Sequence, residues 1–251
     1  MSENKSEVSN LESKVPNLEQ DIKKKTMKYG NDDLYESPID THLFHPLGLF
    51  LVDPLRNLGL NPNQVTALSA VSACLSCYYY FNNKTKEAIL CYLLSYIFDC
   101  VDGRMARKYN MGSKLGAALD LTSDVFVTFI LILTIYVKKK DKLETIHYLG
   151  FAVVILGLSL CHGLTEALAN YKKYGHDNFY KSKKEEYRNE KSIIFDFYLS
   201  ILKSSYNSYK FLVPEFNQEK IDKYMELVKY FGPGTSIVII LGIMYYLKDA
   251  E

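Results

Sequence analysis

The 251-residue sequence lacks several features that mark common classes of protein. Its first residues contain no long apolar run, so we expect no cleavable signal peptide. The formal net charge is only +1, which gives no sign of a polyanionic partner such as nucleic acid. No Gly-x4-Gly-Lys-Ser/Thr phosphate-binding loop occurs, so chemistry on ATP has no support. An EF-hand is also excluded, because no segment has the alternating oxygen ligands of that loop.

Cysteine is present but has no pattern of metal binding. All five cysteines lie inside apolar runs: Cys74, Cys77, Cys91, Cys100 and Cys161. The Cys-x2-Cys pair among them lacks a second pair, or histidines, at the spacing of a zinc site. We therefore interpret the cysteines as buried free thiols, which behave as small apolar side chains.

The polar and apolar residues are unevenly distributed. The mean hydropathy of −0.10 averages a polar beginning with strongly apolar later blocks. Residues 1–40 are rich in Ser, Asn, Glu and Lys, a composition that predicts a disordered tail. Residues 41–251 are predicted to form one membrane domain, with an interfacial amphipathic helix or two over His42–Leu60. The charged run Tyr180–Lys191 is interpreted as a solvated loop.

The apolar blocks predict an all-α fold, a polytopic membrane bundle of about six transmembrane helices. These core helices are expected at about 64–82, 86–108, 116–137, 147–170, 192–213 and 233–248. Their alternation would place Lys248 on the side of the N-terminal tail, and Lys210, Lys220 and Lys223 on the opposite side. Counted this way, Lys and Arg are in excess on the side of the tail and of the 109–115 connection. The positive-inside rule therefore predicts that this side faces the cytosol.

Four carboxylates are embedded between two of these apolar runs, at Asp99, Asp102, Asp120 and Asp124. Charged groups that deep in an apolar sequence are costly unless they are paired or line a wet cavity, so they indicate a functional site. On a helix, residues three and four apart share a face, so Asp99 and Asp102 form one stripe and Asp120 and Asp124 another. Two such stripes facing each other would gather four carboxylates, which divalent cations make tolerable.

The residues around these carboxylates resemble the signature of the CDP-alcohol phosphotransferase family of membrane enzymes, D-x2-D-G-x2-A-R-x8-G-x3-D-x3-D. The eight fixed positions are all present: Asp99, Asp102, Gly103, Ala106, Arg107, Gly116, Asp120 and Asp124. Upstream, the stretch Asn61-Pro-Asn-Gln-Val-Thr66 resembles the start of the family's first core helix.

The resemblance implies a reaction in which an alcohol displaces CMP from a CDP-alcohol, with one of the two substrates lipidic. It implies that Asp99, Asp102, Asp120 and Asp124 hold two Mg²⁺ or Mn²⁺ ions, and that Asp124 also acts as the base on the incoming hydroxyl. It further implies a substrate site made of Asn63, Gln64, Thr66, Asp102, Gly103, Ala106, Arg107, Ser113 and Gly116. A homodimer is implied as well, and the endoplasmic reticulum membrane if the organism is eukaryotic.

The identity of the two alcohols stays open. The Gly116–Asp120 stretch is more similar to the branch that uses CDP-diacylglycerol as the donor. The alternative is transfer of phosphocholine or phosphoethanolamine from a CDP-amino alcohol to diacylglycerol. Val125 stands where inositol-type members commonly have arginine, which argues against an inositol phosphate acceptor. A transporter or metal-binding channel is the alternative of another class, but it predicts acidic residues spread along a pore rather than clustered.

Overall fold

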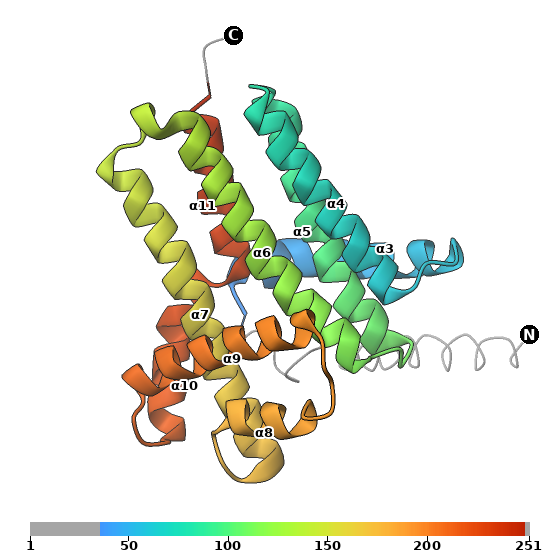
Figure 1. Cartoon of the computed structure of the whole chain (residues 1–251), viewed down its shortest axis with the longest axis vertical. Coiled ribbons are helices and arrows are strands. Elements are labelled where there is room, and N and C mark those ends of the chain that lie inside the picture. The colour runs from blue at the N-terminus through green and yellow to red at the C-terminus, as the bar shows by residue number, and fades with distance from the viewer. Residues whose placement is uncertain (1–35, 249–251) are drawn as a thin grey trace, which may run out of the picture.

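The structure is a computed structural model that describes residues 36–248, and within them it is all-α, as predicted (Figure 1). Most of the predicted tail, residues 1–40, lies outside the described residues. Its last five residues do not: the described segment begins at Glu36 and packs into the bundle, where Ser37 and Asp40 are buried. The expected domain boundary at residue 40 therefore falls inside a packed segment.

The six predicted core helices are all present, with ends shifted by a few residues. The α-helices are α3 His45–Asn57, α4 Pro62–Phe81, α5 Thr85–Lys108, α6 Lys114–Lys139, α7 Thr145–Tyr174, α8 Phe179–Glu186, α9 Ile193–Leu212, α10 Gln218–Val228 and α11 Pro233–Tyr246. Three short helices lie beside them: the π-helix η1 Asp40–Phe44, which leads into α3, and the 3-10 helices η2 Lys140–Lys142 and η3 Lys229–Phe231. The helix predicted within His42–Leu60 is α3.

Two short helices, α8 and α10, were not expected from the sequence. The solvated loop predicted over Tyr180–Lys191 is wrong for its first half, which is helical as far as Glu186. Helix α8 forms because the Asn178 side chain accepts a hydrogen bond from the Lys181 amide at 3.0 Å, which caps the first turn. The buried Phe179 ring then anchors that turn in the core.

Helices α4, α5 and α6 form one half of the bundle, in which α5 runs antiparallel to both α4 and α6 (Figure 1). Two serines of α4 join it to α5: Ser69 donates to the Ser95 carbonyl at 2.9 Å, and Ser76 donates to the Ala88 carbonyl at 2.8 Å. Small polar side chains of this kind allow close helix packing in a membrane and satisfy their hydrogen bonds across the interface.

Helix α9 does not cross the bundle, although the sequence predicted a membrane span there. It lies crosswise over the lower half of α7, toward one end of the bundle (Figure 1). Near its C-terminal end, Tyr209 and Lys210 both donate to Asp177 at 2.6 Å, and Asp177 directly follows α7. The two ends of α9 therefore stay at the same end of the bundle, which we call the motif end because the loop between α5 and α6 lies there.

This arrangement corrects the predicted positions of four lysines. Phe216 stacks on Tyr171 near the C-terminus of α7 with ring centroids 3.8 Å apart, so α10 starts at the motif end. Lys210, Lys220 and Lys223 thus lie at the motif end rather than opposite it. Leu247 packs with the ends of α4 and α6 in one apolar cluster, so the following Lys248 lies at the far end instead. The excess of cations at the motif end is larger than the sequence indicated.

The last crossing of the bundle is a broken helix made of α10, η3 and α11. At the break, the Gly234 amide, in the first turn of α11, donates to Asp40 Oδ2 at 2.9 Å. Ser37 and Tyr96 donate their hydroxyls to the same carboxylate at 2.8 and 2.5 Å. Asp40, far from α11 in the sequence, thus caps the start of α11. A helix N-terminus favours a negative charge of this kind.

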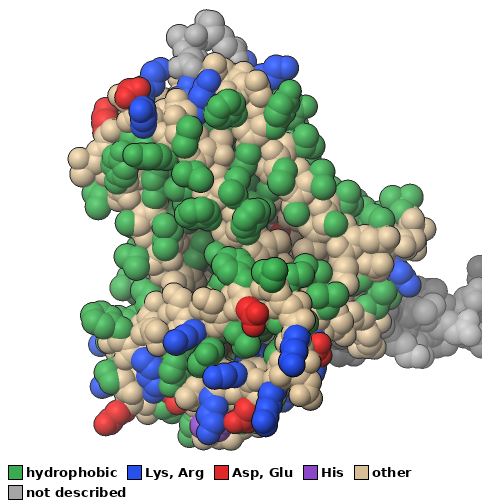
Figure 2. Space-filling view, in the orientation of Figure 1, with side chains coloured by type: hydrophobic (Ala, Val, Ile, Leu, Met, Phe, Trp, Pro, Cys, Tyr) green, Lys and Arg blue, Asp and Glu red, His purple; other side chains and the backbone are tan. Residues whose placement is uncertain are grey.

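Three helical segments are long and apolar enough to cross a membrane: Lys114–Lys142, Thr145–Tyr174 and Gln218–Tyr246. Exposed hydrophobic side chains form a band across the middle of the molecule, and charged side chains gather at its two ends (Figure 2). Phe126 and Phe129 on α6, and Leu149 and Ile155 on α7, are among the large exposed apolar residues. This distribution is the one that a lipid bilayer requires.

Candidate active site

Helices α5 and α6 bring three of the four predicted aspartates together. One carboxylate oxygen each from Asp99, Asp120 and Asp124 lies within 4.8 Å of the other two. The carboxylates of α5 and of α6 thus point toward one another, as their spacing predicted. Asp99 and Asp120 are half-buried, while Asp124 is exposed on the surface of the protein. We call these three residues the aspartate cluster.

Asp102, predicted as a fourth ligand, is not part of the aspartate cluster. It lies on the next turn of α5, is 3% exposed, and its Oδ2 accepts a 2.5 Å hydrogen bond from the Thr66 hydroxyl. Thr66 was predicted on the substrate side of the same site, and the structure joins it directly to the α5 motif. The role of Asp102 as a ligand stays a prediction.

At the start of α4, one predicted site residue, Gln64, stabilises the end of the helix. Asn61 caps α4, and its side chain accepts from the Gln64 amide at 3.0 Å. The Gln64 side chain in turn accepts from the Asn61 amide at 2.9 Å, which completes a capping box. Gln64, predicted to contact the nucleotide, thus holds the first turn of α4 in this structure.

Asn63 of α4 lies close to Ser113 and Gly116 at the start of α6. Ser113 caps α6 by accepting from the Gly116 amide at 2.9 Å. A Cβ built on Gly116 would lie 3.0 Å from both Asn63 Oδ1 and Ser113 Oγ. Any larger residue would therefore push against both side chains, which explains a glycine at this position.

Arg107 lies along its own helix toward the preceding turn. A Cβ on Gly103 would be 3.2 Å from the Arg107 Nη1, so the guanidinium group lies across the glycine. Ala106, between them on the same helix, is half-buried. Gly103, Ala106 and Arg107 therefore share one short segment of α5, next to Asp102 and beyond the aspartate cluster.

Two contacts at the motif loop involve residues that the sequence did not single out. Lys108 and Tyr109 donate to Asp53 of α3 at 2.6 and 2.8 Å, and these hydrogen bonds lower the pKa of the Asp53 carboxyl. Lys114, at the start of α6, donates to the Glu186 carbonyl of α8 at 3.0 Å. Both contacts join residues more than fifty positions apart, so no local pattern in the sequence could have shown them.

The comparisons with known proteins match the same part of the chain. The family model for CDP-alcohol phosphatidyltransferase covers residues 60–186, which contain the aspartate cluster and the start of α4. The chain is 41% identical over 63 residues to CDP-diacylglycerol–inositol 3-phosphatidyltransferase of Saccharomyces cerevisiae. It is 40% identical over 63 residues to probable CDP-diacylglycerol–inositol 3-phosphatidyltransferase 2 of Arabidopsis thaliana.

A third relative matches over a longer stretch. It is the cardiolipin synthase (CMP-forming)/mitochondrial hydrolase fusion protein of Schizosaccharomyces pombe, 33% identical over 122 residues. These matches cover 25%, 25% and 48% of this chain, but only 28%, 28% and 19% of the relatives' own lengths. No solved structure matches the chain significantly.

Proposed function

The chain belongs to the CDP-alcohol phosphatidyltransferase family, and we propose on this premise that it is a membrane enzyme that transfers a substituted phosphate from a CDP-alcohol to an alcohol acceptor, releasing CMP. The observation that carries the proposal is the aspartate cluster, which lies inside the stretch that the family model matches. The excess of cations at the motif end favours a site that faces the cytosol.

The residues of the cluster fit divalent metal ions. Asp99, Asp120 and Asp124 offer only oxygen donors, which Mg²⁺ and Mn²⁺ prefer, and the three oxygens are close enough to surround one ion. Asp102, on the adjacent turn, would take part in holding a second ion. When bound, two such ions neutralise the charge of a diphosphate and of its leaving group.

The chain's own residues supply the other requirements of the reaction. Asp124, the most exposed carboxylate of the cluster, accepts the proton of the incoming hydroxyl. Arg107 pairs with a phosphate oxygen, because its planar guanidinium offers two parallel donors. Asn63 and the bare backbone of Gly116 let the nucleotide approach closely, and Thr66 holds the Asp102 carboxylate in one orientation.

CDP-diacylglycerol is the favoured donor, with a small hydroxylated alcohol as the acceptor. Two of the relatives are named for this donor, and the Gly116–Asp120 stretch resembles the branch of the family that uses it. Acyl chains also need an apolar surface beside the site. The helix α3 packs on α5 and exposes Leu47 and Phe50, which would contact them.

The test is an assay of CMP release by the purified full chain in lipid nanodiscs. CDP-diacylglycerol is offered with inositol, glycerol 3-phosphate and serine, and CDP-choline and CDP-ethanolamine are offered with diacylglycerol. We expect CMP from CDP-diacylglycerol with one acceptor of the first group. Turnover only with CDP-choline or CDP-ethanolamine would reverse which substrate carries the acyl chains. Absence of CMP release with every pair, in protein that remains folded, would contradict the enzymatic proposal.

A further inference from the structure

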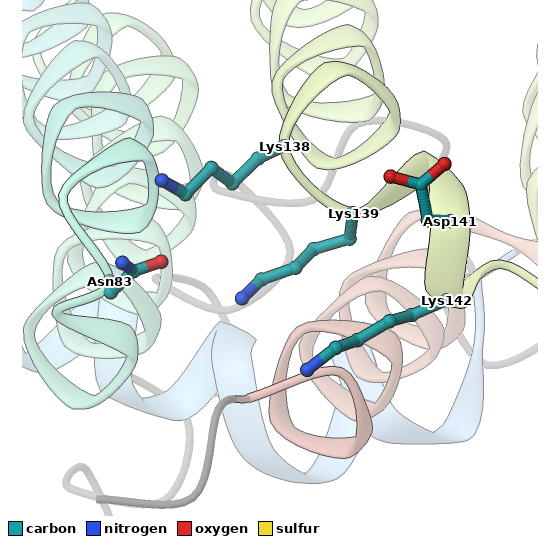
Figure 3. A pocket seen from close by; sticks show the side chains of 5 residues that line it. All are labelled: Asn83, Lys138, Lys139, Asp141 and Lys142. Carbon is teal, nitrogen blue, oxygen red and sulfur yellow. The ribbon is translucent and has the colours of Figure 1, made fainter.

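A cavity of about 270 Å³ lies at the far end of the bundle, away from the aspartate cluster. It is lined by Asn83, in the turn between α4 and α5, and by Lys138, Lys139, Asp141 and Lys142, at the end of α6 and in η2. We call it the lysine pocket. Figure 3 shows that the three lysine side chains extend in the same general direction, away from the ribbon of α6 and η2 toward the turn that carries Asn83.

The lining of the lysine pocket has an excess of positive charge. Among the described residues that line it, three lysines accompany one aspartate, which gives them a net charge of +2. Lys139 is only 5% exposed, and lysine is among the residues least often buried to that extent. A concave surface of this kind concentrates anions, because its low-dielectric walls strengthen the field of the cations.

Helix ends often carry lysines for a simpler reason, the favourable interaction of a cation with the negative end of the helix dipole. That reason accounts for the run Lys138, Lys139 and Lys140 in the sequence. It does not explain why only some of these lysines line the cavity. Lys140 is exposed and does not line the cavity, whereas Lys138, Lys139 and Lys142 do.

The surroundings of the lysine pocket are apolar and face outward. Phe81 comes just before the turn that carries Asn83, Tyr136 and Val137 come just before Lys138, and Ile146 follows η2 at the start of α7; each is at least 45% exposed. The ammonium group of Lys138 lies 5.2 Å from the centre of the Phe81 ring, so cationic and apolar surfaces adjoin directly. Phe81 and Tyr136 lie near the ends of helices that we treat as membrane spans, the depth at which lipid headgroups lie.

We propose that the lysine pocket binds the phosphate group of an anionic membrane lipid. The cavity has room for a phosphate and the first atoms of a glycerol backbone, and the acyl chains would lie over the exposed apolar residues beside it. A soluble phosphate has the same charged group but gains nothing from those residues. The inference depends on the chain being embedded in a membrane and not on the reaction at the motif end.

The test measures how much lipid the full chain retains after purification in a neutral detergent. Native mass spectrometry counts bound phosphatidylglycerol, which carries one negative charge, against phosphatidylcholine, which carries none overall. The variants are Lys142→Gln and Lys138→Gln, with Lys140→Gln as the matched control. The control removes the same charge from the same end of α6 without touching the pocket. The thermal unfolding midpoint of each variant, followed by circular dichroism, shows that it is folded.

We expect the wild-type chain to retain phosphatidylglycerol in preference to phosphatidylcholine. In each pocket variant the ratio of bound phosphatidylglycerol to bound phosphatidylcholine should fall about fivefold, since a lysine beside an anionic lipid contributes about that factor to its binding. The control should keep the preference of the wild type. An equal loss of preference in Lys140→Gln and Lys142→Gln would overturn the proposal, because the preference would then come from the general positive charge of the surface. Full displacement of the lipid by excess inorganic phosphate would also overturn the proposal, because the pocket would then be a site for soluble phosphate.

Discussion

Replacement of Thr66 by valine removes one hydroxyl from the candidate site and changes the side-chain shape little. In the structure this hydroxyl donates a 2.5 Å hydrogen bond to Asp102, which is only 3% exposed. The same oxygen lies 3.1 Å from the Pro62 carbonyl, one turn earlier in α4, so the hydroxyl also lies against its own helix. In Thr66→Val, Asp102 loses this donor and remains in a site that water hardly reaches.

The size of the effect follows from the charge of the acceptor. A hydrogen bond to a charged group contributes about 1.5–3 kcal/mol, roughly twice a neutral one. At about 1.4 kcal/mol for each factor of ten, its loss corresponds to a decrease of about tenfold to hundredfold in kcat/KM. Because Asp102 then binds a cation less well, we also expect the Mg²⁺ concentration for half-maximal CMP release to rise.

The assay is CMP release by purified protein as a function of free Mg²⁺, for the wild type, Thr66→Val and Thr66→Ser. Serine keeps the hydroxyl and loses only a methyl group, so Thr66→Ser should retain most of the activity and the normal Mg²⁺ dependence. If Thr66→Val released CMP as fast as the wild type at every Mg²⁺ concentration, the link between Thr66 and Asp102 would have no part in the reaction. Equal losses in the two variants would assign the effect to packing rather than to the hydrogen bond.

Four further predictions concern the metal site and the bundle. EDTA should abolish CMP release and Mg²⁺ or Mn²⁺ should restore it, since the aspartate cluster needs cations; full activity in chelator would contradict a metal site. Asp124→Asn should lower turnover by about 10²-fold or more, a typical effect of losing a general base, while CDP-alcohol still binds in equilibrium dialysis. Asp99→Asn and Asp120→Asn should instead lose metal and nucleotide binding together, and normal binding by either would exclude it as a ligand. Asp40→Asn should lower the stability by about 1–3 kcal/mol, because an amide cannot accept all three hydrogen bonds; an unchanged unfolding midpoint would contradict this.

The sequence predicted the helices well because their signals are local. In the structure Asn61, followed by Pro62, caps α4, and Ser113 caps α6, and these residue types are preferred at helix starts. The aspartate spacing likewise predicted which carboxylates share a face. Three of them do meet across α5 and α6 in the structure.

The path of α9 could not be predicted in the same way. Its length and apolar content are those of a short membrane span, and a lengthwise or a crosswise helix has the same sequence pattern. Its orientation is decided by tertiary contacts, above all those of Tyr209 and Lys210 with Asp177 more than thirty residues earlier. The place of Asp40 was missed for a related reason: a single aspartate in a polar segment looks solvated until its distant partners are known.

The cap that Asp40 provides for α11 also constrains the order in which the chain is assembled. Asp40 and Gly234 are separated by 194 positions, so the ribosome completes nearly the whole bundle between them. Ser37 and Tyr96 can donate to Asp40 before α11 is made, but the Gly234 amide cannot, so the buried carboxylate has its full set of donors only once α11 is in place. Conversely, α11 begins inside the bundle without a cap of its own, and its first turn stays unsatisfied until that segment arrives. Docking of the Asp40 segment and completion of the first turn of α11 are therefore coupled, and neither is finished until α11 has been synthesised.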